Sequence, residues 1–326
     1  MRQRALIGRS RELAEIEARL AMARLVTLVG PGGVGKTALA QEAARTLGSR
    51  FPHGARHVDL TRIDGASGVP GAVAAQLGFD SFDSLLGSLA EQPVLLVVDN
   101  CEHVLDAVAD TVAHLLGACR QPSVVATSRS PLEVPGESIV VVAPLPLPTG
   151  DDPSACPSVE LFVARCRESG AVGVGDGDGD VAAVAELCRQ LDGLPLALEL
   201  AAARARTMSV TEISGRLADS VGVLARPRFR GDPRHRSLAD TIGWSYDLLA
   251  PAVAELLESL AVFAGPFGAA AARAAAPPEL HADFHDAFDE LVAASLITVD
   301  GGAGATSYRL LDTVRTFARD RLERRG

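Results

Sequence analysis

The stretch at residues 30–37 has the clearest chemical signature in this 326-residue chain. It fits the pattern G-x-x-x-x-G-K-[ST] through Gly30, Pro31, Gly32, Gly33, Val34, Gly35, Lys36 and Thr37. Such a loop turns backbone N–H groups inward around phosphate oxygens, and the N-terminus of a following helix adds a favourable field. We predict that Lys36 bridges the β- and γ-phosphates of a nucleotide, that Thr37 holds Mg²⁺ and that the cradle extends to Ala38. The alternative is a strand, turn and helix with chance glycines.

Lys36 is the only lysine of the chain, and the remaining strongly basic residues are all arginine. The guanidinium of arginine is a planar, forked group, so it cannot replace the compact ammonium charge that this loop needs. A guanine-binding N-K-x-D motif would require a second lysine, so adenine is the predicted base. Ile7, Gly8 and Arg9 could lay their backbone along that adenine; the alternative is a simple helix start.

An acidic residue ends a second apolar run. Residues 94–98 are all Val or Leu and are followed by Asp99, which is typical of a parallel strand buried on both faces. We predict that Asp99 joins Thr37 in binding Mg²⁺. Hydrolytic P-loop proteins usually place a second acid next, but here Asn100 cannot accept a proton as a carboxylate does. Glu102 is the nearest substitute, so we expect slow hydrolysis.

Arg129 follows a third predicted strand, residues 123–128. A guanidinium at that point could contact a γ-phosphate and so sense its presence. The alternative is a surface arginine before the turn at Ser130 and Pro131.

These residues require a parallel sheet to bring them together. Apolar runs predict its five strands at residues 25–29, 57–60, 94–99, 123–128 and 139–142, with a helix from Ala38 to Leu47 after the glycine loop. Residues 158–220 have a helical pattern, with Pro195 starting one helix. Further helices are predicted at about 238–249, 251–263, 269–276 and 283–295, with a hairpin at 296–299 and 307–310 before a terminal helix.

The predicted fold is therefore an α/β P-loop domain with a parallel five-stranded sheet, followed by an all-α helical domain and a winged-helix domain. We place the P-loop domain at residues 1–148, the helical domain at 149–225, and a basic linker with the winged helix at 226–326. The candidate recognition helix at 283–295 has four acids and neither Arg nor Lys. Phosphate repulsion would dominate there, so we expect the winged helix to be a packing module that does not bind DNA directly.

Composition narrows the class of protein. Hydrophobic residues make up 48% of the chain, which suits a packed core, and the net charge of −10 argues against nucleic acid as the main partner. Five scattered cysteines and the lack of a signal peptide or an 18-residue apolar stretch predict a reduced, cytoplasmic protein without a membrane span. The pair His281 and His285 lacks further metal ligands.

Together these segments resemble the STAND class of P-loop ATPases, and most closely the NB-ARC-like module of actinobacterial AfsR/SARP and LuxR-type transcriptional regulators. The residues that carry the resemblance are Ile7–Arg9, Gly30–Thr37, Leu96–His103, Ala126–Arg129, Gly193–Ala197, Arg234–Leu238, Trp244–Leu249 and Tyr308–Arg315.

The resemblance implies three domains folded over one nucleotide, with ADP locking a closed state and ATP permitting oligomerisation. It implies that Pro195 packs on the adenine and that Arg129 is the γ-phosphate sensor. The family's Met-His-Asp motif is Leu310-Leu311-Asp312 here, so the histidine that would contact the ADP β-phosphate is missing. An arginine of the linker at 226–236 could replace it.

The sequence thus predicts an ADP/ATP-dependent switch with weak ATPase activity, excised from a bacterial transcriptional regulator whose DNA-binding and sensor domains lie outside this chain. Its expected partners are adenine nucleotide with Mg²⁺, those flanking domains, and further copies of itself in the ATP state. The alternatives are a P-loop ATPase or kinase with fast turnover, and a regulator that binds DNA through the winged helix.

Overall fold

A computed structural model describes residues 6–63, 65–149, 153–171, 173–175, 177–219, 221–224, 236–300 and 306–325. Its internal contacts divide the chain into two compact units. The first comprises Met1–Gly30 and Gly35–Ala143, and the second comprises Pro31–Val34 and Pro144–Gly326. Most of the predicted basic linker, residues 226–235, lies outside the described residues.

The first unit is built on the predicted five-stranded parallel sheet, with strand order β2-β3-β4-β1-β5. Every residue of the central strands β3 and β4 is buried. A parallel strand covered by helices on both faces needs such an unbroken apolar run. The strands are β1 (Leu25–Val29), β2 (Ala55–Asp59), β3 (Leu95–Asp99), β4 (Ser123–Ser128) and β5 (Glu137–Val141).

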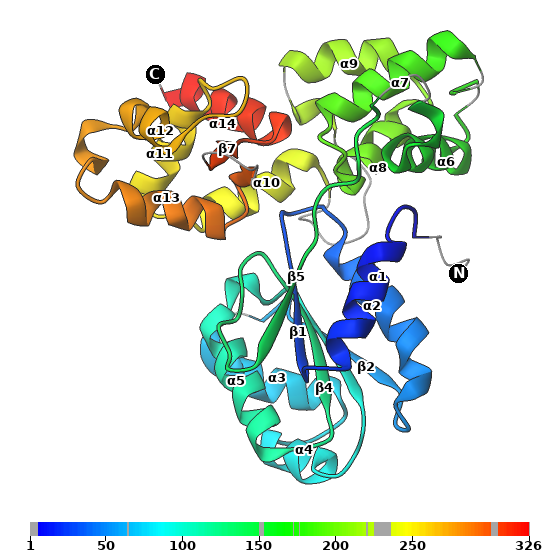
Figure 1. Ribbon diagram of the computed structural model, residues 1–326, viewed down its shortest axis with the longest axis vertical. Helices are drawn as coiled ribbons and strands as arrows, with labels where there is room; N and C mark the ends of the chain where they lie inside the picture. The colour runs from blue at the N-terminus through cyan, green and yellow to red at the C-terminus, as the bar shows by residue number, and fades with distance from the viewer. Residues whose placement is uncertain are drawn as a thin grey trace. The chain divides into compact units, whose positions relative to one another are not determined.

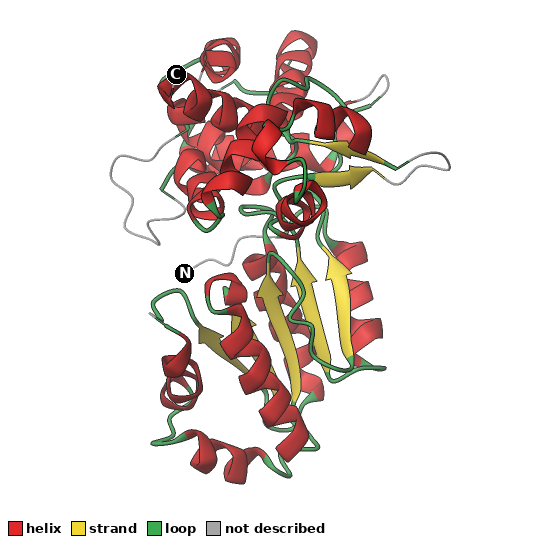
Figure 2. Ribbon diagram, turned by 90° about the vertical axis from the view of Figure 1, so that its left-hand side faces the viewer, coloured by secondary structure: helices red, strands yellow, loops and turns green. Residues whose placement is uncertain are grey.

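Helices cover both faces of this sheet (Figures 1 and 2). Helices α1 and α2 pack on one face, and α3, α4 and α5 lie on the other. The helix after the glycine loop begins at Lys36, two residues before the predicted start, because Lys36 and Thr37 already form its first turn. The helices are α1 (Ser10–Leu20), α2 (Lys36–Leu47), α3 (Val69–Gln76), α4 (Phe82–Leu89) and α5 (Leu105–Ala118), with short turns η1 (Gly48–Arg50), η2 (Ala66–Gly68) and η3 (Cys101–His103).

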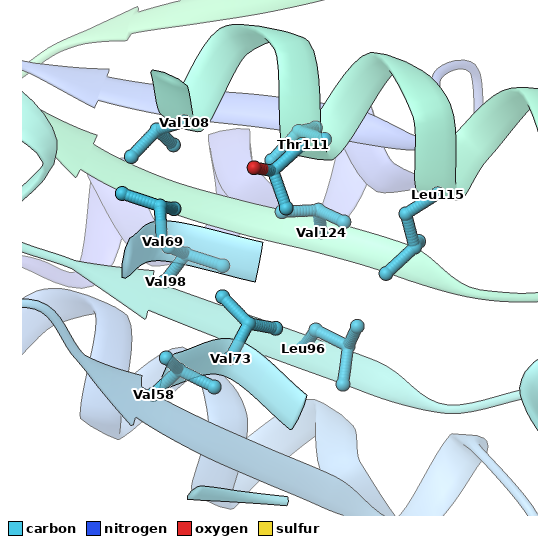
Figure 3. Close-up of a pocket in the computed structure, with 10 residues that line it drawn as sticks. Val58, Val69, Val73, Leu96, Val98, Val108, Thr111, Leu115 and Val124 are labelled. Carbon is cyan, nitrogen blue, oxygen red and sulfur yellow. The ribbon is translucent and has the colours of Figure 1, made fainter. Parts of the chain in front are cut away.

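Side chains of β2, β3 and β4 meet those of α3 and α5 around a cavity of about 10 Å³ (Figure 3). Its lining is apolar apart from Thr111, whose hydroxyl donates to the backbone oxygen of Ala107 at 2.6 Å. A space of this size holds at most one water, and an apolar lining offers that water no partners. The cavity is therefore part of the core and is not a ligand site.

The N-terminal part of the second unit is helical, as predicted. Helix α6 packs on α8, and α7 packs on α9. Proline begins α6 and α8, which is a position where its missing N–H costs nothing. The elements are η4 (Pro153–Ala155), α6 (Pro157–Ser169), α7 (Asp178–Gln190), α8 (Pro195–Arg204), α9 (Val210–Asp219) and η5 (Val221–Val223).

The remainder of the second unit is the predicted winged helix, with a hairpin before the last helix (Figure 2). Phe267 pairs with Tyr308 through two backbone hydrogen bonds of 2.8 Å, which attach the segment before α12 to the hairpin. Phe288 of α13 packs edge-on against Tyr308, with ring centroids 4.8 Å apart. The elements are α10 (Leu238–Asp247), α11 (Pro251–Leu260), α12 (Ala269–Ala275), η7 (Pro278–Leu280), α13 (Phe284–Ala293), β6 (Thr298–Asp300), β7 (Ser307–Arg309) and α14 (Asp312–Arg325).

Among the described residues, none of the helices combines the length and the apolar character needed to cross a bilayer.

Candidate functional site

The predicted site residues of the first unit lie at one edge of its sheet. Gly30 follows β1, Asp99 ends β3 and Arg129 follows β4. Strand β4 lies between β1 and β3, so the three chain segments leave the sheet side by side at their carboxyl ends. This edge is where open α/β sheets bind ligands.

The glycine loop has the backbone shape that its composition predicts. Gly33 and Gly35 have φ values of +78° and +98°, in the region that side-chain-bearing residues avoid. Gly35 leads directly into α2, and the Lys36 ammonium turns back to donate to the backbone oxygen of Gly30 at 2.6 Å. The loop is thus closed by its own lysine.

Lys36 is 9% exposed. Burial lowers the pKa of Lys36 to about 8, an effect that Glu102 and Asp99 oppose and Arg129 reinforces. A buried ammonium with a lowered pKa is stabilised by an incoming anion, because the anion replaces the water that burial removed. The electrostatics therefore favour a negatively charged ligand at this loop.

Thr37, the residue after Lys36, is hydrogen-bonded to Asp99. The Thr37 hydroxyl donates to Asp99 Oδ1 at 2.9 Å, and the Thr127 hydroxyl donates to the same oxygen. Burial raises the pKa of Asp99, partly offset by these two hydrogen bonds and by His57, whose Nε2 lies 3.8 Å from Asp99 Oδ2. A hydroxyl and a carboxylate are hard oxygen donors, the ligands that Mg²⁺ prefers. The residues present therefore fit the predicted metal.

Asn100 occupies a turn with φ of +65°, a conformation that asparagine tolerates. Its backbone N–H donates to Thr127, and its amide nitrogen lies 3.1 Å from Asp59 Oδ1 and 2.9 Å from Thr61 Oγ1. Asp59 was not predicted as a site residue. It ends β2 in register with Asp99, whereas the predicted strand at 57–60 continued one residue past it and so did not mark it as a strand end.

Glu102 does not face solvent: its side chain is 9% exposed and lies beside that of Arg129, which is 7% exposed. Arg129 Nε is 3.4 Å from Glu102 Oε1. Glu102 sits in η3, just beyond the end of β3. The predicted sensor and the predicted substitute acid thus form a buried ion pair.

The N-terminal residues of the predicted set are placed at the start of α1. Arg9 is buried and pairs with Glu12 at 2.6 Å, whereas Gly8 is exposed with φ of +71°. Ile7 is half-buried. Their contact with a base stays a prediction.

The other predicted residues belong to the second unit: Pro31, Gly32, Gly33 and Val34 of the loop, and Pro195. The backbone N–H of Leu196, next to Pro195, donates to the Gly33 oxygen at 3.1 Å. Leu311, in the position of the family's histidine, is buried. The arginines offered as its replacement lie outside the described residues, apart from Arg236, which pairs with Asp240 at 3.2 Å.

Known proteins resemble this chain in sequence. The winged helix-turn-helix domain family matches residues 249–323. The chain is 35% identical to Rv0894 of Mycobacterium tuberculosis, an uncharacterized protein, in an alignment that covers 99% of this chain and 82% of the relative. It is 40% identical to Rv0890c of the same organism, named as a candidate HTH-type transcriptional regulator, of which it spans only 35%.

Two further similarities bear on the resemblance found in the sequence. The chain is 30% identical to the regulatory protein AfsR of Streptomyces coelicolor. The alignment covers 92% of this chain and 30% of the length of AfsR. The structure superposes on a Walker-type ATPase of Pyrococcus abyssi with a TM-score of 0.66 over 96% of both chains at 15% sequence identity. The predicted P-loop ATPase fold and the predicted relationship to AfsR are both confirmed.

Proposed function

We propose that this chain is an ADP/ATP-dependent switch. The premise is its family: the chain belongs with Rv0894 and the matching part of AfsR to the STAND-class P-loop ATPase modules of actinobacterial regulators. In this proposal the bound nucleotide sets the conformation of a cytoplasmic transcriptional regulator, ATP is hydrolysed slowly, and the ATP state self-associates. The DNA-binding and sensor domains that the switch controls would lie elsewhere in the longer protein. The aligned segment is 35% of its relative Rv0890c, so that protein is almost three times as long as the segment.

The residues of the first unit have defined parts in this proposal. Lys36 and the loop from Gly30 to Thr37 bind the phosphates, and Thr37 and Asp99 hold the metal through their paired oxygens. Mg²⁺ held by these two residues would neutralise negative charge on the phosphates. Arg129 contacts the γ-phosphate, while Ile7–Arg9 and Pro195 contact the adenine.

Slow hydrolysis follows from the residues after Asp99. Asn100 uses its amide nitrogen toward Asp59 and Thr61 and has no carboxylate with which to polarise water. Glu102 has one, but it pairs with Arg129 in this structure. A water-activating carboxylate must lie within hydrogen-bond reach of the attacking water, and the residue directly after Asp99, which usually supplies it, is an amide here. Such an arrangement suits a long-lived switch state.

The observation that carries the proposal is the buried Lys36 beside the Thr37–Asp99 pair. The chain retains its only lysine at this place, 9% exposed and bonded to Gly30. Burying an ammonium costs free energy unless an anion or hydrogen bonds compensate. A phosphate ligand explains both the position and the choice of lysine.

The first test is to denature freshly purified protein and identify any released nucleotide by anion-exchange chromatography. We expect near-stoichiometric ADP from the wild type and none from Lys36→Ala. Arg45→Ala is the matched control, because Arg45 lies on the same helix but is exposed and forms a surface ion pair with Glu42. It should retain the nucleotide.

Steady-state turnover then separates the switch from its rival. Switch ATPases turn over at about one per minute or less, on the order of the unassisted rates of GTPase switches. Turnover far above this value, abolished by Lys36→Ala, would favour a fast ATPase or kinase. Protein that binds neither ADP nor ATP would contradict the proposal altogether.

A further inference from the structure

The ion pair between Glu102 and Arg129 joins two residues that sequence reasoning assigned to separate tasks. Glu102 lies in η3 after β3, and Arg129 follows β4, the next strand of the sheet. Both side chains are almost fully buried, and Arg129 Nε lies 3.4 Å from Glu102 Oε1. A pair in this setting interacts strongly, since little water screens it.

The pair belongs to a group of charged side chains at the carboxyl edge of the sheet, which includes Lys36 and Asp99 and, beside Asp99, Asp59. Glu102 and Asp99 raise the pKa of Lys36 and Arg129 lowers it, so these four charged groups lie close enough to interact electrostatically. Two of them are cations and two are anions. Adding a polyphosphate beside Lys36 brings further negative charge, which repels the Glu102 carboxylate and competes with it for the guanidinium.

We infer that Glu102 is the internal counter-ion of Arg129 and sets the preference of the site for ADP over ATP. This inference rests on the proposed function and deepens it. When the γ-phosphate is absent, Glu102 compensates the buried guanidinium. When ATP binds, Arg129 must exchange this carboxylate for the γ-phosphate. Breaking the ion pair therefore makes the free energy of ATP binding less favourable and leaves that of ADP binding unchanged.

Removing the negative charge of Glu102 should therefore favour ATP selectively. In Glu102→Gln the side chain keeps its shape but no longer neutralises Arg129, and the γ-phosphate becomes the stronger anionic partner. We expect the ratio of the Kd for ADP to the Kd for a non-hydrolysable ATP analogue to rise roughly tenfold, a typical size for coupling between sites. Affinity for ADP should change much less.

The experiment is isothermal titration of the wild type, Glu102→Gln, Glu102→Asp, Arg129→Gln and the double variant Glu102→Gln/Arg129→Gln. Each is titrated with ADP and with the ATP analogue in the presence of Mg²⁺, after removal of bound nucleotide. Thermal denaturation checks that each variant is folded. Glu102→Asp retains the charge and should leave the ratio close to that of the wild type.

A rise in the ratio in Glu102→Gln that disappears in the Arg129→Gln background would support the inference, because a general effect on the loop would persist without the arginine. Three results would overturn it: an unchanged ratio, equal tightening of both nucleotides, or the same rise in the double variant. A wild type that binds neither nucleotide would instead refute the proposed function. If Arg129→Gln does not fold, the contrast between Glu102→Gln and Glu102→Asp still tests whether the charge of Glu102 sets the ratio, and equal ratios in the two variants would overturn the inference.

Discussion

The Asp192 carboxylate binds Thr313, 121 residues later in the chain, through two hydrogen bonds. Asp192 Oδ2 accepts from the backbone N–H and from the hydroxyl of Thr313, both at 2.9 Å. Its other oxygen accepts from the backbone N–H of Asp312 at 2.9 Å and lies 3.4 Å from Arg309. Asp192 therefore caps the N-terminus of α14 from a loop between α7 and α8, within the second unit.

Loss of this cap should destabilise the second unit. Asp192→Ala leaves the first-turn N–H groups of α14 without their acceptor in a buried place, which costs about 2–4 kcal/mol of unfolding free energy. Urea denaturation followed by circular dichroism would measure it. Asp247→Ala is the control, because Asp247 is exposed at the end of α10 and its removal should cost less than about 0.5 kcal/mol. Equal losses in the two variants would contradict a capping role.

The same carboxylate predicts a pH dependence of stability. Burial raises the pKa of Asp192 from 3.8 to about 6, despite the hydrogen bonds from Thr313 and Asp312, and the Asp312 carboxylate adds to the rise. Arg309 and Arg315 are the cations nearby, and Arg315 pairs with Asp312 at 3.0 Å. Between pH 3.8 and 6 the folded state binds more protons than the unfolded state, so Asp192 contributes less stability as the pH rises through this range.

Comparison with Asp192→Asn removes the background, since the amide cannot titrate while the carboxylates that do not interact with Asp192 titrate equally in both proteins. From pH 4 to pH 7 the wild type should lose about 2.4 kcal/mol of unfolding free energy relative to the variant, since this window covers most of the titration and each pKa unit is worth 1.36 kcal/mol. Urea denaturation at half-unit intervals of pH would measure the difference. A constant difference across this range would show that the pKa is not raised.

Gly193, the residue after Asp192, should not tolerate a side chain. Its φ is +64°, and a Cβ atom would lie 2.2 Å from the backbone oxygen of Leu145, whose own N–H donates to the Gly193 oxygen at 3.0 Å. Gly193→Ala must therefore move backbone, and we expect a loss of about 3 kcal/mol or more. Gly215→Ala in helix α9 is the matched control: a Cβ there meets nothing within 4 Å, and the change should stabilise the helix by about 0.5–1 kcal/mol. Thermal denaturation would rank the two.

Much of the fold was predictable because its signals are local. The glycine loop and the all-apolar strand before Asp99 are encoded within a few residues, and Pro195, which begins α8, marks a helix start directly. Contacts between distant residues were not predictable in this way. The Glu102–Arg129 pair depends on β4 lying next to β3, and the cap at Thr313 depends on a segment 121 residues away. Asp59 was not predicted as a site residue because only the register of β2 with β3 places it beside Asp99.

The paired oxygens of Thr37 and Asp99 predict how the site depends on metal. If these residues hold Mg²⁺, removal of the ion with EDTA should weaken binding of the ATP analogue to the wild type by roughly tenfold or more, since the metal offsets phosphate charge. Asp99→Asn keeps the shape but loses the charged ligand, and its affinity should be low with or without EDTA. A variant that retains the full EDTA effect would exclude Asp99 as a metal ligand. Fluorescence titration with and without EDTA would distinguish these results.

The exposed face of α13 is acidic. Its buried side consists of Phe284, Ala287, Phe288 and Leu291. The acids Asp286, Asp289 and Glu290 are exposed. In a helix that enters a DNA groove these side chains would face phosphates, so repulsion should prevent binding.

We therefore expect no binding of this chain to a 20-base-pair duplex tighter than about 100 µM at physiological salt, the weak end of non-specific affinities. Fluorescence anisotropy at several salt concentrations would measure it. The variant Asp286→Arg/Asp289→Arg/Glu290→Arg is the positive comparison: replacing three anions by cations on the same face should create binding that weakens steeply as salt increases, because bound counterions are released. Salt-sensitive, micromolar binding by the wild type would instead mean that another surface of the winged helix contacts DNA, and the module would then act on DNA directly.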